Sequence, residues 1–183
     1  MEMKDGGSGE KARLLNSPLR ISLTIPGKPQ QWSRASRGQN GPSFTPGNVT
    51  KQMDLFRLAW QRDGELRFPD ATPLQLHAGF FFERPKSHYR TGKNAHLLRD
   101  GMEDAEPISR PDIDNLVKLI GDSLSGMAFD DDARITLGGQ IEAFIPRGTS
   151  SFTEFTIART TKQWRRLLIG ELNVAAELFE EQM

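Results

Sequence analysis

The chain has 183 residues, which is enough for one compact domain with a hydrophobic core. It contains 24 Lys and Arg and 24 Asp and Glu, so its net charge favours neither nucleic acid nor membrane as a partner. The absence of cysteine excludes disulfide scaffolds, zinc ribbons, iron–sulfur clusters and thiolate nucleophiles. No run approaches 18 apolar residues and the N-terminal residues lack an apolar signal segment, so we expect a soluble, cytoplasmic protein.

The N-terminal third is expected to begin with a tail and a strand. Residues 1–17 are rich in Gly, Lys, Glu and Ser, and this composition predicts a disordered tail. Residues 19–25 alternate apolar and polar side chains, which predicts a strand with one buried face. Residues 28–47 then form a loop of basic, aromatic and small residues that contains no acid.

A helix, a strand and a long loop follow. Apolar side chains recur at spacings of four, three and four over residues 49–60, which predicts a helix. The next strand, residues 74–82, ends in three consecutive Phe residues, a run typical of a strand buried on both faces. The polar, mixed-charge composition of residues 84–110 predicts a long loop, which is either a binding loop or a disordered insertion.

The clearest predicted element is a helix over residues 113–127, where apolar side chains recur at i, i+3, i+4, i+7, i+11 and i+14. Residues 133–145 then predict a strand, and residues 152–157 alternate as its expected hairpin partner. An apolar stripe in residues 161–183 predicts a closing amphipathic helix, whose packing partner is the core or a second copy.

Charge is unevenly distributed along the chain. Residues 1–60 carry nine basic and four acidic side chains, whereas residues 111–144 carry two and seven. This distribution suits a basic surface that binds phosphates beside an acidic site that concentrates cations. The alternative is that these are ordinary solvated surface charges. The mixture of basic and aromatic residues in residues 28–47 is typical of nucleic-acid contact surfaces, and also of a flexible surface loop.

Carboxylates form two groups around the second helix. Asp112 and Asp114 stand at its start, and residues 130–132 are three consecutive Asp. Hard divalent cations such as Mg²⁺ bind a few carboxylates with water and substrate phosphate, so these groups are candidate ligands. Asp112 and Asp114 converge only if Asp112 is still extended at the helix entrance.

Each of these residues also has a structural interpretation. Asp112 fits a helix N-cap, Asp114 a first-turn acid that complements the helix dipole, and residues 130–132 a solvated turn. Lys118 lies one turn after Asp114, where it either pairs with that carboxylate or neutralises a scissile phosphate.

Other catalytic motifs fail. Residues 121–125 spell the GDSL block of an esterase family, but the predicted helix contains them and every histidine precedes Ser123, so the downstream partners of a triad are missing. An EF-hand beginning at Asp112 would need Gly and Glu where the chain has Val117 and Ser123. There is no Walker A loop and no His-Glu-x-x-His.

Two segments resemble the signature of the RusA-type Holliday-junction resolvases, namely RPDIDNLVK at residues 110–118 and GMAFDDDARI at residues 126–135. The segment IPGKP at residues 25–29 is similar to phage-type members. The resemblance covers roughly residues 19–158, so we expect a nuclease domain over residues 18–160. It implies an α/β (α+β) fold with a small mixed sheet packed against helices, in a homodimeric, Mg²⁺-dependent endonuclease that resolves four-way DNA junctions by paired nicks.

By this resemblance the metal-binding aspartates are Asp112, Asp114 and Asp132, and the essential lysine is Lys118. The run of three aspartates leaves Asp131 as the alternative to Asp132. The basic side chains expected to hold the DNA backbone are Lys28, Arg34, Arg37 and Arg110. The alternatives are a catalytically silent DNA-binding dimer, another structure-selective nuclease, and the esterase.

Overall fold

The computed structural model describes most of the expected nuclease domain, namely residues 20–33, 36–37, 43–62, 67–108 and 111–160. The predicted N-terminal tail and the predicted C-terminal helix lie outside the described residues.

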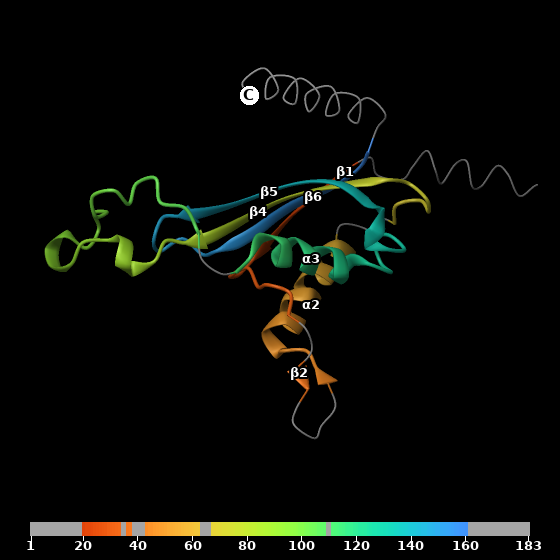
Figure 1. The fold of residues 1–183 in the computed structure, drawn as a ribbon, viewed down its shortest axis with the longest axis horizontal. Coiled ribbons are helices and arrows are strands. Elements are labelled where there is room, and N and C mark those ends of the chain that lie inside the picture. The colour runs from red at the N-terminus through yellow and green to blue at the C-terminus, as the bar shows by residue number, and fades with distance from the viewer. Residues whose placement is uncertain (1–19, 34–35, 38–42, 63–66, 109–110, 161–183) are drawn as a thin grey trace, which may run out of the picture.

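Four strands form one mixed sheet in the order β1-β6-β4-β5 (Figure 1). β6 pairs antiparallel with both β1 and β4, whereas β4 pairs parallel with β5. A separate two-stranded ribbon, β2–β3, lies within the loop predicted over residues 28–47. The strands are β1 (Arg20–Pro26), β2 (Ser36–Arg37), β3 (Ser43–Phe44), β4 (Leu74–Glu83), β5 (Ile135–Ile145) and β6 (Phe152–Arg159).

Two helices, α2 (Gly47–Arg62) and α3 (Ile113–Leu124), lie on the same face of the sheet (Figure 1). Their apolar stripes face the buried side chains of the central strands; the ring centroids of Phe56 and Phe155, for example, lie 5.7 Å apart, edge to face. The predicted α+β class, a mixed sheet packed with helices, is confirmed. None of the helices in the described part of the chain is long and apolar enough to cross a membrane.

The predicted hairpin between the last two strands is wrong. β6 lies between β1 and β4, and β5 pairs with β4 instead. A parallel pair such as β4–β5 needs a long crossover connection, and the segment that contains α3 supplies it. Alternation along β6 shows that the strand is half-buried, but it carries no information about which strand lies beside it.

Predicted boundaries and burial differ from the structure in two places. α3 ends at Leu124, three residues early, because the chain turns at Gly126, whose φ of 79° lies in the left-handed region that glycine adopts without strain. β4 is not buried on both faces: Phe80 and Phe82 are in the core, whereas Phe81 points to the other face and stacks on Phe152.

Candidate active site

The site begins at the N-terminus of α3. Asp112 precedes the helix with extended backbone angles, φ −76° and ψ 134°, as its convergence with Asp114 requires. Its backbone carbonyl accepts hydrogen bonds from the amides of Asn115 and Leu116, but its carboxylate makes no capping hydrogen bond. The exposed carboxylate of Asp112 therefore does not cap the helix, although its Oδ2 accepts a long hydrogen bond from the side-chain amide of Asn115, at 3.5 Å.

Four acidic residues line one pocket of about 730 Å³. Asp112 and Asp114 reach it from the start of α3, Glu142 from β5, and Glu106 from the end of the loop that precedes α3. The structure thus brings together two of the predicted metal ligands and adds two carboxylates that the sequence analysis did not single out.

Glu142 is the more informative of the added residues. Its Oε2 is buried and has no hydrogen-bond partner among the described residues. Burial raises the pKa of the Glu142 carboxyl above its usual value, and the nearby charge of Asp112 raises it further. A carboxylate oxygen held without a partner beside a second carboxylate is positioned to accept a cation.

A change of register explains why the sequence pattern did not reveal Glu142. The pairing of β5 with β4 skips Thr136, which is therefore an extra residue in β5. One extra residue moves every later side chain to the opposite face of the sheet. Glu142 consequently lies opposite the buried Phe80, on the helix-covered face, whereas the apolar Ile141 is 56% exposed on the other face.

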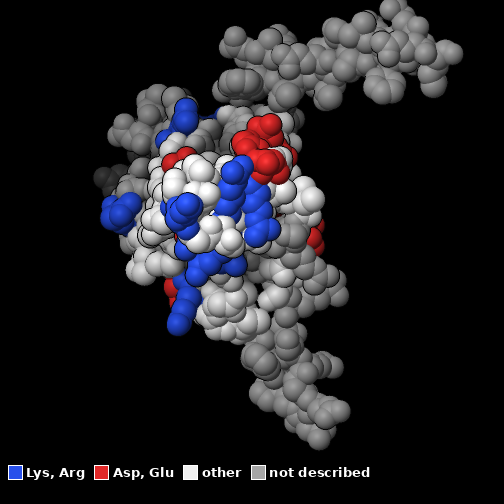
Figure 2. Space-filling model, turned by 90° about the vertical axis from the view of Figure 1, so that its left-hand side faces the viewer, with Lys and Arg blue, Asp and Glu red and all other residues white. Residues whose placement is uncertain are grey.

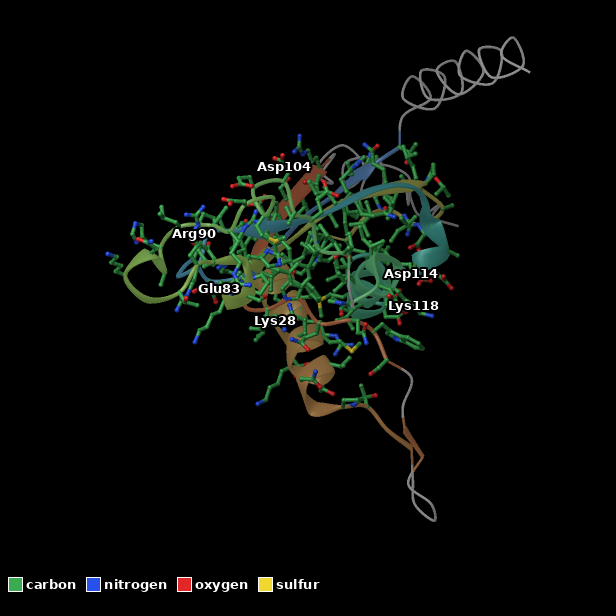
Figure 3. The ribbon with its side chains drawn as sticks, turned by 60° about the vertical axis from the view of Figure 1, so that its left-hand side comes forward. Lys28, Glu83, Arg90, Asp104, Asp114 and Lys118 are labelled. Carbon is green, nitrogen blue, oxygen red and sulfur yellow. The ribbon has the colours of Figure 1, made fainter. Side chains whose placement is uncertain are left out.

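Lys118 lies one turn along α3 from Asp114, and Figure 3 shows both on the same side of the helix. Its Nζ is 4.1 Å from the centroid of the Trp32 ring. The amide of Trp32 donates to the carbonyl of Asn115 at 2.9 Å, which ties the loop that follows β1 to α3. No ion pair joins Lys118 to Asp114 within the described residues, so the structure places the ammonium over an aromatic face instead.

The three consecutive aspartates have different surroundings. Asp130 forms an ion pair with Arg134, which lowers the pKa of Asp130, and Asp131 Oδ1 accepts from the amide of Ala133 at 2.8 Å. Asp132 packs against Gly121 of α3. Asp132 is an exposed residue, but partial burial of its carboxyl and the hydrogen bond with Asp131 raise its pKa, and the charge of Asp122 raises it further.

The predicted ligands fall into two groups along α3. Asp112 and Asp114 share the pocket at its start, whereas Asp132 and Asp131 lie beside its last turns, and the charge of Lys118 acts on Asp132. Within the described residues no three acidic or histidine side chains are close enough together to hold one metal ion.

The predicted DNA-binding residues are only partly described. Lys28 is exposed and lines a pocket that also includes Pro111, the neighbour of Asp112. The backbone of Arg37 lies in β2, and Arg34 and Arg110 lie outside the described residues.

The esterase hypothesis is wrong. Ser123 lies inside α3, is completely buried, and donates its hydroxyl hydrogen bond to the carbonyl of Leu119. A nucleophilic serine must reach substrate and be activated by a neighbouring base, and this hydroxyl does neither.

A comparison with family models identifies the chain. The model described as Endodeoxyribonuclease RusA matches residues 25–144, a span that runs from the end of β1 into β5 and includes Asp112, Asp114, Lys118 and Glu142. A search of curated proteins finds no match. With a match over more than half of its length, the chain belongs to the RusA family of endodeoxyribonucleases.

Proposed function

We propose that this endodeoxyribonuclease is a Mg²⁺-dependent homodimer that resolves four-way DNA junctions by paired, symmetric nicks. The observation that carries the proposal is the pocket at the start of α3, which Asp112 and Asp114 share with Glu142, whose buried Oε2 has no hydrogen-bond partner among the described residues. The family match supports nuclease chemistry, and the donor set supports a hard divalent cation.

The residues of the pocket fit Mg²⁺. This ion is typically held by one or two carboxylates, with water and substrate phosphate completing its octahedral shell, so a cage of three protein ligands is not required. Asp112 and Asp114 would supply the carboxylates, and the orphaned oxygen of Glu142 would be satisfied by the ion or by one of its waters. Asp132, with Asp131 beside it, would form a second carboxylate group farther along α3.

The chain's own residues account for the rest of the chemistry. When bound, Mg²⁺ would act as a Lewis acid and would lower the pKa of the water molecule that attacks the phosphodiester. Lys118, held over Trp32, would stabilise the negative charge that develops on the phosphate oxygens. Lys28, together with Arg34, Arg37 and Arg110, would bind the DNA backbone and make binding strongly salt-dependent.

The test compares a labelled four-way junction with the matching linear duplex, with and without Mg²⁺. Wild-type protein is expected to nick only the junction, at symmetric positions, and only with the metal. Asp112→Asn should lower the nicking rate at least about 100-fold, because catalytic metal ions contribute several kcal/mol to transition-state stabilisation. Circular dichroism should show an intact fold, because the carboxylate of Asp112 is exposed and makes no capping hydrogen bond that the substitution could remove.

Asp54→Asn is the matched control. It removes an equally charged, exposed carboxylate on α2 that pairs with Arg57 and does not line the pocket, so the nicking rate should be retained. Binding of the junction without any cleavage, in any divalent metal, would instead identify a catalytically silent DNA-binding dimer. Cleavage of flaps or duplex at equal rates would identify another kind of nuclease.

A further inference from the structure

The loop that connects β4 to α3 projects beyond the end of the sheet (Figure 1). Hydrogen bonds donated by three backbone amides join the base of this loop to the end of β5 and the β5–β6 connection. Arg84 donates to the Ile145 carbonyl at 2.9 Å, Gly148 donates to Glu83 Oε1 at 2.8 Å, and Arg147 donates to the Tyr89 hydroxyl at 3.0 Å. The loop and the segment that carries Arg147 therefore form one unit.

Polar contacts also hold the loop to itself. The Arg90 amide donates to Leu97 and the Arg99 amide to His88, both at 2.9 Å, and the Nε atoms of the two arginines donate to the carbonyls of Leu98 and Tyr89. Within residues 86–99 only Tyr89 is buried, so packing of the core does not require this segment. A long loop that holds its shape without contributing to the core is typically functional.

Charge is segregated along the loop. Residues 84–99 contain five Lys or Arg and no acid, whereas residues 100–106 contain four acids and no base. Figure 2 faces this end of the molecule and shows Lys and Arg gathered at its centre, with the largest group of acidic residues above them. Lys86, Lys93 and Arg147 are exposed, and the side chains of all three are without an ion pair in the described part of the chain.

The loop leads directly to the candidate active site. Its last residues, Glu106 to Ile108, line the same pocket as Asp112 and Asp114. Figure 3 shows Arg90 and Glu83 at one end of the molecule, away from Asp114 and Lys118. A polyanion bound at the pocket and extending along the loop would meet the three cations that have no ion pair among the described residues.

We infer that residues 84–99, together with Arg147, form a basic arm that binds the DNA backbone away from the scissile phosphate, an inference that rests on the proposed function. The unpaired cations of the arm make contacts to phosphates, which supply affinity and register but not base recognition. Arg84, Arg90 and Arg99 have a different role, since their side chains hold the arm together.

The experiment measures anisotropy of a labelled four-way junction in EDTA between about 50 and 200 mM KCl. The test protein combines Lys86→Gln, Lys93→Gln and Arg147→Gln. The control is Arg20→Gln, an exposed arginine at the start of β1, which lies at the opposite end of the sheet from the arm. Thermal unfolding of all variants confirms that each is folded.

The triple variant should make the slope of log K against log salt less negative by about 2 to 3, since each lost phosphate contact changes it by about 0.9. Arg20→Gln should leave the slope unchanged.

The outcomes separate the two proposals. If wild type nicks junctions but the triple variant binds with the wild-type slope and affinity, the arm is not a DNA contact and the proposed function stands. If wild type never nicks but the triple variant loses the expected slope, the proposed function is wrong and the arm remains a DNA-binding surface. If wild type does not bind DNA at all, both are wrong.

Discussion

At the scale of single residues, the contact between Lys118 and Trp32 decides where the positive charge of the site lies. The ammonium is 4.1 Å from the ring centroid, and the Trp32 backbone is itself hydrogen-bonded to α3. An exposed lysine side chain otherwise samples many rotamers, so the aromatic face orders it next to the carboxylate of Asp114.

Trp32→Ala should therefore slow nicking of the bound junction more than it weakens junction binding. A cation–π contact contributes about 0.5–2 kcal/mol, which corresponds to a two- to thirty-fold lower rate. Single-turnover nicking at saturating protein measures the rate, and anisotropy measures the affinity. Trp32→Phe keeps an aromatic face and should recover most of the rate; an equal loss with Phe and Ala would show that the ring does not position Lys118.

The carboxyl of Asp132 gives a prediction about pH. Burial and the hydrogen bond with Asp131 raise its pKa above the ordinary value of about 3.9, so its charged form destabilises the folded state relative to the unfolded chain. In EDTA, Asp132→Asn should increase the free energy of unfolding at pH 7. The gain should shrink as the pH falls toward 4, because the wild-type carboxyl then becomes protonated in the fold.

Urea unfolding of wild type and Asp132→Asn at pH 7 and at pH 4.5 measures this difference. Asp131→Asn removes the neighbouring charge but keeps a side-chain oxygen that can accept from the amide of Ala133, so it should also raise stability at pH 7. A stability gain for Asp132→Asn that is the same at both pH values would contradict the assignment of the raised pKa.

At the scale of elements, the turn between α3 and β5 is held by one arginine. Arg134 is only 10% exposed and binds Asp130 as well as the carbonyls of Pro69 and Thr72, which precede β4. It therefore ties the aspartate run to the start of the neighbouring strand, and with it the position of Asp132 beside α3.

Arg134→Ala should cost about 2 kcal/mol or more in the free energy of unfolding, because it leaves a carboxylate and two part-buried carbonyls without their donor. Urea denaturation provides the measurement. Arg67→Ala is the matched control: Arg67 is exposed and pairs with Asp70 at 3.6 Å, and its loss should cost less than about 1 kcal/mol. Equal costs for the two variants would show that the contacts of Arg134 stabilise the fold no more than an exposed ion pair does.

At the scale of the whole molecule, the parallel pairing of β4 and β5 determines where the site forms. The connection between these strands contains both the basic arm and α3, so the start of α3 returns to the carboxyl end of β4. Glu142 comes from near the carboxyl end of β5. Functional sites in parallel sheets commonly form outside these strand ends.

The proposed homodimer makes two nicks because each protomer carries one site. Mixed dimers of wild type and Asp112→Asn should nick one strand of a cruciform plasmid and give open circles, whereas wild-type dimers should give linear product. Differently tagged protomers, purified through both tags, provide the mixed species. Linear product at the wild-type rate from mixed dimers would show that one protomer cuts both strands.

Much of the fold was predictable from side-chain periodicity. The stripes of α2 and α3 and the alternation of β1 and β4 each identify an element, because burial of one face imposes a period on the sequence. The Asp112-x-Asp114 spacing before a helix, with Lys118 one turn later, indicated the site at the start of α3. The resemblance to RusA proteins rests on the segment that contains these residues, on residues 126–135 and on residues 25–29.

Tertiary structure alone decided which strands lie side by side and which carboxylates meet. Periodicity reports that a strand has a buried face but not its neighbour, so it could not place β6 between β1 and β4. Thr136 is recognised as an extra residue only from the pairing of β5 with β4. This extra residue is what places Glu142 near Asp112. Likewise, Trp32 reaches Lys118 only because the loop after β1 crosses α3. A local pattern records local burial, whereas contacts between distant segments depend on how the whole chain packs.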